Sequence, residues 1–505
     1  MKADMILYSN AIFDSVGNKP FSGGIAIEGK KIVAVGNREE IKKYETPDTV
    51  VKDFGEKLIM PGFIDSHGHY SSGAAYFGEE ALHDMEQFTS EEECAKAIGE
   101  FAKAHPKLKL IKGQGWYLSR WGENPSFPTA ASIDKYVSDR PVYMIASDLH
   151  SVWFNTLAME ESGLKEAMKD LRDDYVLKDE NGNPTGVVRE AGRVVTDKLL
   201  EKYALTPEEA DKKDDDDQTG LMHALNEQGI TGFSDVSFVL PDDLKETYKH
   251  MKKIDDADEM TIRLYIYPGT DFKPELIKDI VPYEDYYSSD EMHIAGVKNI
   301  LDGVTATFTA AMLEPYADNP DEKGVPATTA ENIEAWVKEA NKYKYGCRIH
   351  CIGDRAVRMA LDAYEKSGKT NDMEGIRNAI EHIEMINPDD IPRFGKLNVI
   401  ASMQPRHQIL DRGEKLYRCG LERAKYEWAF KSIYDGGGRI AIGTDYPVVS
   451  YNTYENIYMG VTKRDLDGTQ YGTLSPKEKL TLAQTIKGYT AEAAFINSME
   501  DKVGT

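Results

Sequence analysis

The 505-residue sequence has few cysteines and no long apolar run, and these absences exclude several classes of protein. Its four cysteines are too few for a disulfide framework in a chain of this length. No stretch approaches about 18 consecutive apolar residues, so we expect no membrane span. The first ten residues lack the apolar core of a signal peptide, and we therefore expect a protein of the reducing cytoplasm.

Basic residues are also scarce relative to acidic ones. Lys and Arg number 61 against 86 Asp and Glu, which gives a net charge of −25. So acidic a chain repels phosphate backbones, which disfavours a nucleic-acid partner, but the charge does not identify a substrate. The charge block at residues 212–218 is interpreted as the solvated start of a helix rather than as a cation site.

Hydrophobic residues make up 41% of the chain, and its length suits a large domain with a smaller one. Residues 1–57 contain short apolar runs interrupted by Gly17-Asn18 and Gly29-Lys30, a pattern typical of β-strands joined by hairpins. We therefore expect a small β domain at this end of the chain.

From residue 58 onward, short apolar runs end in polar side chains, and helical stretches separate many of them. Strands that alternate with helices imply a parallel sheet, and eight of them imply a (β/α)8 TIM barrel with its active site at the carboxyl ends of the strands. We expect this barrel over residues 58–480. The eight runs are 58–69, 229–237, 261–267, 294–302, 346–353, 376–384, 398–404 and 439–447.

The first two runs are far apart in the chain, so we expect residues 70–205 to form an inserted subdomain. It contains apparent strands at 108–113 and 141–146 and a hairpin-like segment at 179–186. Insertions on the active-site face of a barrel often control access to the substrate.

The strongest local motif is Pro61-Gly-Phe-Ile-Asp-Ser-His-Gly-His69. Side chains two apart on a strand point to the same face, so His67 and His69 can reach one cation, and neutral imidazole suits zinc. A His-x-His pair arises by chance often enough to be weak evidence alone. This pair, however, ends the strand that opens the predicted barrel.

Further nitrogen and oxygen donors lie near the ends of later runs, namely Lys298, His350, His382 and Asp445. A lone buried histidine is usually a satisfied core residue. A lysine inside an apolar strand instead needs a partner or a modification, because burying an unpaired ammonium is costly. Cys347 and Cys351 flank His350, which leaves a zinc–thiolate site open, although small buried thiols are the simpler interpretation.

Motifs spread over nearly the whole chain carry a resemblance to a known family: PGFIDSHGH, GQGWYLSRW, RPVYMIASDLHSVWFN, PTGVVRE, GVKNILDG, IHCIGDRAV, EHIEMINPDDIPRF, SMQPRH and GTDYPV. The sequence resembles the amidohydrolase superfamily, in particular its YtcJ-like branch (amidohydrolase family 3), which includes N-substituted formamide deformylases. The resemblance implies a metal-bearing (β/α)8 barrel beside a β-sandwich built from both chain ends. Residues 481–505 are accordingly expected to begin a return to the β-sandwich that is truncated here.

The resemblance also implies roles for the candidate residues. Lys298 matches a lysine that is carbamylated in many members and bridges two metals, and Asp445 matches a carboxylate that binds metal and transfers protons. Zinc, one or two ions per chain, is the expected cofactor, and iron or manganese stays open because the same ligands accept them. The histidines that match metal ligands are His67, His69, His350 and His382.

We predict a hydrolase that cleaves a carbon–nitrogen bond, other than a peptide bond, in a small amide, N-formyl or N-acyl compound. A metal ion would activate water, with Asp445 as general base and then general acid. Ester hydrolysis, deamination or isomerisation at the same site stays open, and so does a non-catalytic regulatory or binding protein on the same fold. A homodimer is a possible assembly.

Five residues are expected to contact the substrate. Some lie in the insertion and others follow predicted strands. Packing is the alternative role for the tryptophan, and ion pairing is the alternative for the glutamate and the arginine. The five are Trp116, His150, Glu190, Arg355 and His407.

Overall fold

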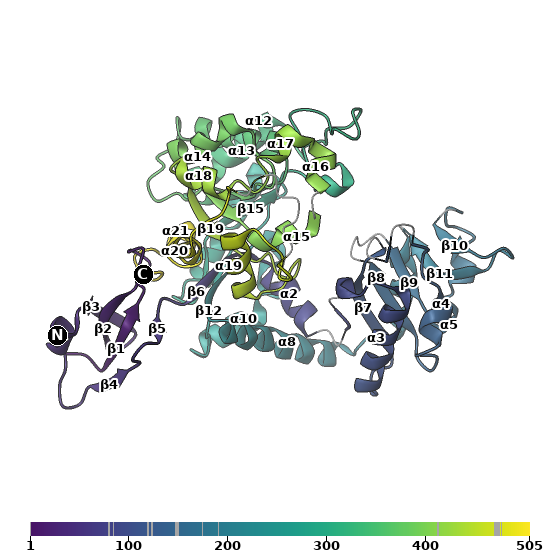
Figure 1. Cartoon of the computed structure of the whole chain (residues 1–505), viewed down its shortest axis with the longest axis horizontal. Coiled ribbons are helices and arrows are strands. Elements are labelled where there is room, and N and C mark those ends of the chain that lie inside the picture. Colours follow the sequence, from purple (N-terminus) through teal and green to yellow (C-terminus); the bar gives the residue numbers. More distant parts are fainter. Residues whose placement is uncertain are drawn as a thin grey trace. The chain divides into compact units, whose positions relative to one another are not determined.

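The computed structural model describes residues 2–505 apart from 79–80, 84, 119–120, 123–124, 147–150, 174, 190, 412–413, 469–474 and 476. The chain divides into two compact units, and Figure 1 labels many of their elements. One unit combines Met1–Phe77 with Asp214–Thr505, and the other is Gly78–Lys213. The second unit corresponds to the insertion expected at 70–205, and it begins and ends somewhat later in the chain.

The amino-terminal strands are β1 (Met5–Ile12), β2 (Phe21–Glu28), β3 (Lys31–Gly36), β4 (Val50–Asp53) and β5 (Leu58–Ile59). They form one sheet in the order β3-β2-β1-β4, with β5 also paired to β1. β2 is antiparallel to β1 and β3, whereas β4 and β5 run parallel to β1. Ile6, Tyr8 and Ala26 pack with Ile41 of helix α1 (Arg38–Lys42) and form the small core of this sheet.

The described residues do not form the β-sandwich that was expected from both chain ends. No strand from the carboxyl-terminal part of the described chain joins the amino-terminal sheet. Residues 482–496 instead form α20 (Leu482–Gly488) and α21 (Ala491–Ile496), which pack on β19 (Arg439–Ile442). A capping box between Thr481 and Gln484 starts α20, which is a local signal for a helix rather than a strand.

Each of the eight runs predicted as strands contains a strand. One parallel sheet has the order β14-β13-β12-β6, and a second has the order β15-β16-β17-β18-β19. The strands of these sheets, besides β19, are β6 (Phe63–Gly68), β12 (Ile230–Asp235), β13 (Arg263–Ile266), β14 (Met292–Ile294), β15 (Gly296–Ile300), β16 (Gly346–Cys351), β17 (Ala379–His382) and β18 (Ile400–Met403).

Main-chain hydrogen bonds link the two parallel sheets at both edges. At one edge, Lys298 N of β15 donates to Pro268 O, just after β13 (2.9 Å). At the other edge, Asp445 N donates to His67 O (2.7 Å) and His69 N donates to Tyr446 O (2.8 Å). The chain that follows β19 therefore lies directly beside the carboxyl end of β6.

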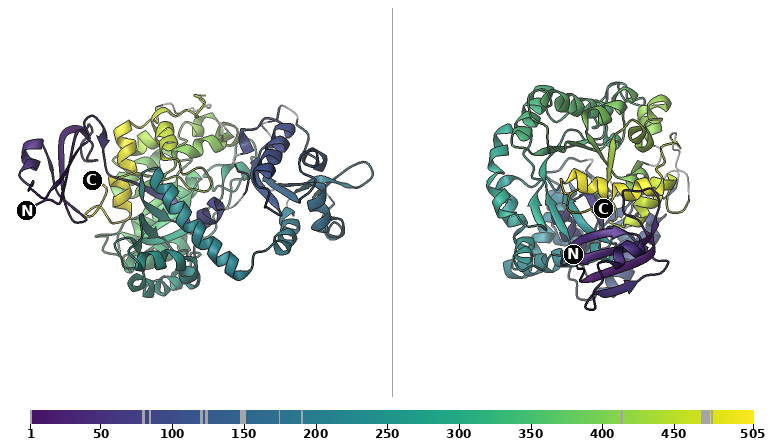
Figure 2. Two further views of the ribbon diagram at one scale, coloured as in Figure 1. Left: turned by 90° about the horizontal axis from the view of Figure 1, so that it is seen from below. Right: turned by 90° about the vertical axis from the view of Figure 1, so that its left-hand side faces the viewer.

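Helices cover the outer sides of these sheets (Figure 2), and the longer helices present an apolar face to the strands. α12 (Ala330–Lys342), for example, buries Ile333, Trp336 and Val337, at helical spacing. Among the described residues, every helix is too short or too polar to serve as a membrane span. The other helices of this unit are α2 (Tyr70–Phe77), α9 (Leu244–Thr247), α10 (Lys249–Asp256), α11 (Pro282–Tyr286), α13 (Asp354–Ser367), α14 (Ile391–Leu397), α15 (Gln408–Asp411), α16 (Glu414–Cys419), α17 (Leu421–Ala424), α18 (Phe430–Asp435) and α19 (Thr453–Thr462).

Helix α8 (Pro207–Glu227) begins in the second unit and continues into the first. The charge block at 212–218, expected at the start of a helix, lies in the interior of α8.

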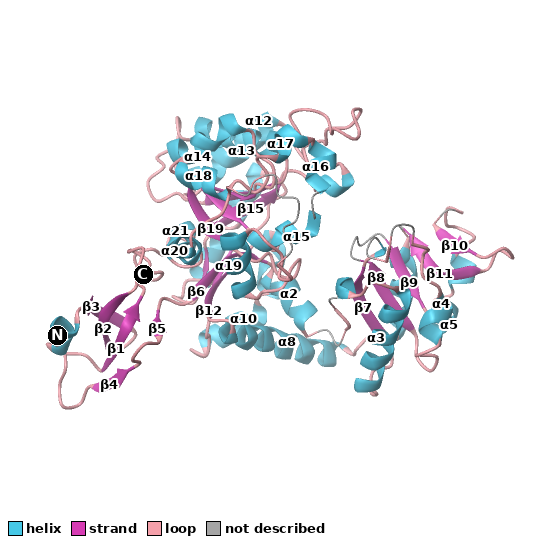
Figure 3. Cartoon of the chain, viewed as in Figure 1, coloured by secondary structure: helices cyan, strands magenta, loops and turns pink. Residues whose placement is uncertain are grey.

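The second unit contains its own five-stranded sheet, in the order β10-β11-β9-β8-β7 (Figure 3). β7 and β8 are parallel and the other neighbours are antiparallel. Its strands are β7 (Ile111–Trp116), β8 (Val142–Ala146), β9 (Ser151–Phe154), β10 (Val176–Lys178) and β11 (Pro184–Arg189). Its helices, besides the start of α8, are α3 (Glu91–Ala104), α4 (Ala130–Asp134), α5 (Thr156–Glu161), α6 (Leu164–Ala167) and α7 (Gly192–Lys202).

Candidate metal centre

The predicted ligands follow the parallel strands, and a buried carboxylate ties two of these strand ends together. Asp65 on β6 accepts hydrogen bonds from His67 N (3.1 Å), Thr444 N (3.0 Å) and Thr444 Oγ1 (2.6 Å). Gly443 is required at this crossing because an added Cβ would lie 2.4 Å from His67 N. These contacts hold Asp445, the residue after Thr444, beside the histidine pair.

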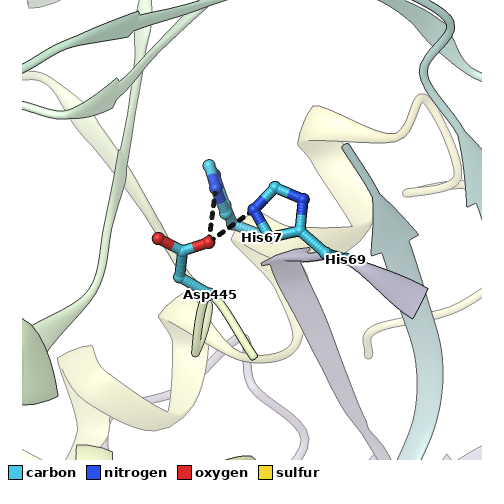
Figure 4. A group of neighbouring side chains, drawn as sticks. All are labelled: His67, His69 and Asp445. Atoms are coloured by element: carbon cyan, nitrogen blue, oxygen red, sulfur yellow. Dashed lines mark ion pairs between the residues drawn. The ribbon is translucent and has the colours of Figure 1, made fainter. Parts of the chain in front are cut away.

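His67, His69 and Asp445 form a compact group of donor atoms (Figure 4). Asp445 Oδ1 lies 3.3 Å from His67 Nε2 and 2.8 Å from His69 Nε2. The side chain of His67 is 1% exposed and that of Asp445 is 7% exposed, so water screens their interaction little. Asp445 also adopts a left-handed backbone conformation (φ 63°), a strain that proteins often retain at functional sites.

Asp445 belongs to a second group as well, with His382 and His407. Its Oδ2 atom lies 3.3 Å from His407 Nε2 and 4.0 Å from His382 Nδ1. All three residues are buried, and the two imidazole rings are stacked with centroids 5.6 Å apart. The sequence placed His382 among the metal ligands but predicted a substrate contact for His407.

Burial keeps the inner histidines neutral. It lowers the pKa of His350 to about 3 and that of His407 to about 4, and it lowers the pKa of His382 well below the ordinary value. Burial alone would raise the pKa of Asp445, but the positive charge and hydrogen bonds of His67 and His69 hold it well below its usual range. The three inner histidines thus offer neutral nitrogen donors beside a carboxylate anion, which are the forms that bind metal ions.

His350 and Lys298 lie close to these groups. The ring centroid of His350 is 4.5 Å from that of His382, but His350 is in neither group of clustered donors. Lys298 is 2% exposed, and burial lowers the pKa of its ammonium to about 8 although the nearby Glu381 opposes this shift. A lowered pKa increases the fraction of neutral amine, which is the reactive form of a lysine.

Two residues that sequence reasoning missed, Glu381 and Arg348, support His67. Glu381 Oε2 contacts His67 Nδ1, and Glu381 accepts hydrogen bonds from Arg348 Nε (2.6 Å) and Nη2 (3.0 Å). Arg348 also donates to Ser66 O and to Ser402 Oγ. Both members of this ion pair are completely buried. A carboxylate that accepts the Nδ1 proton of His67 leaves Nε2 as the atom with a lone pair for a cation.

The remaining residues predicted to contact the substrate are distributed over the two units. Trp116 is 1% exposed in the core of the second unit, where its Nε1 donates to Met144 O (2.8 Å), a setting that favours packing. Arg355 is partly exposed in the first turn of α13, and its main-chain N donates to Ala311 O (3.0 Å). His150 and Glu190 lie outside the described residues.

The comparison with family models identifies the family. A model described as "Amidohydrolase family" matches residues 51–505, and this chain therefore belongs to that family. Protein LONG AFTER FAR-RED 3 of Arabidopsis thaliana is 28% identical, over 98% of this chain and 84% of that protein. The putative amidohydrolase YtcJ of Bacillus subtilis (strain 168) is 25% identical, over 95% of this chain and 88% of that protein. The N-substituted formamide deformylase of Arthrobacter pascens is 22% identical, over 95% of this chain and 87% of that protein.

These relatives confirm the YtcJ-like branch that the sequence motifs indicated. A solved structure of similar fold is an uncharacterized metal-dependent hydrolase from Pyrococcus furiosus, with a TM-score of 0.72. It is 23% identical, and the match covers 99% of this chain and 96% of that one. This likeness shows that the two proteins share a mixed α/β fold, and a shared fold does not determine the activity.

Proposed function

We propose that this protein is a metal-dependent hydrolase whose first cation is held by His67 Nε2, His69 Nε2 and Asp445 Oδ1. The observation that carries the proposal is the convergence of these three donors. Donors on one tetrahedral zinc ion, each about 2.0–2.1 Å from it, lie about 3.3 Å apart. The distances from Asp445 Oδ1 to the two nitrogens, 3.3 Å and 2.8 Å, fit that spacing. Zinc is the proposed metal, and iron or manganese suits the same donors.

We further propose that the two linked parallel sheets are the two halves of one (β/α)8 barrel. The hydrogen bonds at both edges and the helices around the strands support this architecture. The candidate centre then lies at the carboxyl ends of the strands, where barrel enzymes have their active sites.

A bound divalent cation would supply Lewis-acid chemistry, polarising the scissile carbonyl and lowering the pKa of a water molecule. Asp445 lies where its carboxylate can accept a proton from the attacking water and return it to the leaving amine. Glu381 and Arg348 keep the Nδ1 side of His67 occupied, so that His67 presents Nε2 to the site. Carbamylation of Lys298 stays a prediction that its burial and lowered pKa support.

The proposed substrate is a small amide, N-formyl or N-acyl compound, cleaved at a carbon–nitrogen bond other than a peptide bond. Support comes from membership in the amidohydrolase family and from a relative named for the deformylation of N-substituted formamides. We expect the residues that select the substrate in the loops around the centre, because loops vary most between members of one fold.

Elemental analysis combined with a substrate screen tests this function. Protein purified without chelators is analysed for metal and then incubated with a panel of N-formyl and N-acyl compounds, esters and amino-substituted rings. We expect bound metal and the release of a free amine from an amide substrate. Release of alcohol or ammonia instead would redirect the proposal to ester hydrolysis or deamination, and a metal-free protein that zinc does not activate would overturn it.

A further inference from the structure

We propose that Asp302 is a positioning residue for His350, because it fastens the chain after β15 to the chain after β16 at the candidate centre. This inference rests on the proposed function, since it assigns a residue that acts on the centre through another side chain. Asp302 is the last residue of the predicted run 294–302, and the proposed function gives it no role.

Asp302 is a buried residue whose carboxyl group accepts three main-chain hydrogen bonds. Its Oδ1 atom accepts from Ile352 N (2.9 Å). Its Oδ2 atom accepts from Ala311 N and Gly353 N, each at 2.9 Å. One side chain therefore joins two segments that are distant in the sequence: the segment 303–329, which follows β15, and the turn between β16 and α13.

The neighbours of Asp302 hold His350 directly. Leu301 N donates to His350 O (3.1 Å), and the main chain of Gly303 makes a hydrogen bond with the imidazole. Asp302 lies between these two residues in the sequence, and its Oδ1 atom is 3.9 Å from His350 Nε2. By fixing its own position against the turn after β16, Asp302 fixes the main chain from which Leu301 and Gly303 hold the histidine.

His350 belongs to a row of rings that leads to the proposed first cation. Its ring centroid is 4.5 Å from that of His382, and the ring centroid of His382 is 4.7 Å from that of His67. Side chains at a reactive centre need to stay within about 0.5 Å of the productive geometry. Loss of a residue that orients such a side chain typically costs about 10–100-fold in metal affinity or activity.

Anchoring of the segment 303–329 is the competing role for Asp302. Asp302 accepts from Ala311 N in this segment, and Asp354 accepts from Leu313 N two residues further on (2.8 Å). Asp354 is buried as well, but none of its contacts among the described residues involves His350. Asp354 therefore provides a matched control, because it anchors the same segment without holding the histidine.

A double-mutant cycle with this control tests the proposal. We measure kcat and KM on the best amide substrate for wild type, Asp302→Asn, His350→Gln, the double variant and Asp354→Asn. In Asp302→Asn, one oxygen that accepts a main-chain N–H becomes an NH2 group, so two donors face each other. We expect kcat to fall by about 10–100-fold with KM little changed. The double variant should be no slower than His350→Gln alone, and Asp354→Asn should keep the wild-type kcat.

Crystal structures of the two aspartate variants give a readout that does not depend on activity. We expect His350 Nε2 to move by more than about 0.5 Å in Asp302→Asn and to stay in place in Asp354→Asn. If Asp302→Asn fails to fold, Gly303→Ala replaces it. An added Cβ there would lie 2.1 Å from Thr309 Oγ1 and would displace the main chain that holds the imidazole.

Three results would overturn the inference in favour of anchoring alone: additive losses of kcat in the double variant, an equal fall of kcat in Asp354→Asn, or an unmoved His350 ring. A wild-type kcat in Gly303→Ala would overturn it as well. A wild type that hydrolyses no amide, together with the expected movement of the ring, contradicts the proposed function and supports the positioning role.

Discussion

The core of the second unit and the candidate metal centre are both buried clusters of aromatic rings, but two tryptophans of the core and three histidines of the centre differ in whether their ring nitrogens have hydrogen-bond partners. In the second unit, Trp116 Nε1 donates to Met144 O and Trp153 Nε1 donates to Thr129 O, each at 2.8 Å. In the metal centre, His350, His382 and His407 each keep a buried nitrogen without a hydrogen-bond partner among the described residues. Burial of a ring therefore does not by itself mark a binding site.

The largest effect is expected from Asp445→Asn, which removes the anion shared by both donor groups. The amide cannot accept the proton, so turnover falls by about 10²–10⁴-fold. Steady-state kinetics on the best amide substrate measures this loss. Asp258→Asn, which changes a carboxylate that is 82% exposed, serves as the control and keeps wild-type turnover. Near-normal turnover in Asp445→Asn would show that Asp445 does not transfer the proton.

The next effect is on the free energy of unfolding, at the buried ion pair between Arg348 and Glu381. Arg348→Met leaves the buried Glu381 carboxylate without its guanidinium, so the free energy of unfolding falls by about 3–5 kcal/mol. Denaturation followed by circular dichroism measures the change. The double variant Arg348→Met with Glu381→Leu removes both charges and recovers most of the loss. A single variant as stable as wild type would show that the pair contributes nothing.

Metal removal is expected to affect one unit and spare the other. A cation present at about 100 times its dissociation constant stabilises the folded state by about 2.7 kcal/mol, and a chelator removes that contribution. Hydrogen exchange then rises in β6 and β17 and stays unchanged in β8. Equal changes in both units would mean that the metal does not act through the ligands assigned to it.

The smallest effect is expected from Trp116→Phe in the second unit. The substitution leaves the Met144 carbonyl without its donor and loses part of a packed ring, at a cost of about 1–3 kcal/mol. Metal content and KM stay unchanged if Trp116 only packs. A raised KM with unchanged stability would instead restore the substrate contact predicted from the sequence.

The strands of the parallel sheets could be predicted because each is a short apolar run that ends at a chemically distinctive residue. The run that closes at His382 also contains Glu381, and sequence reasoning passed over it. A carboxylate inside an apolar strand needs a partner for the same physical reason as Lys298, so the signal was present. Its partner, Arg348, lies on the neighbouring strand and could be paired with it only once the strands were in register.

Other features depend on tertiary placement that a linear pattern does not contain. The two oxygens of Asp445 bring His69 and His407 to one carboxylate, although these histidines are far apart in the chain. The carboxyl-terminal segment was expected to return to the β-sandwich, yet the capping box at Thr481 was a readable helix signal. His150 and Glu190 keep their predicted substrate roles as predictions.

Anomalous X-ray diffraction at the zinc absorption edge tests the central claim most directly. Crystals of protein purified without chelators and supplied with zinc should show an anomalous peak bounded by His67 Nε2, His69 Nε2 and Asp445 Oδ1. No peak at that position in a well-ordered crystal, or zinc bound only elsewhere on the protein, would contradict the account.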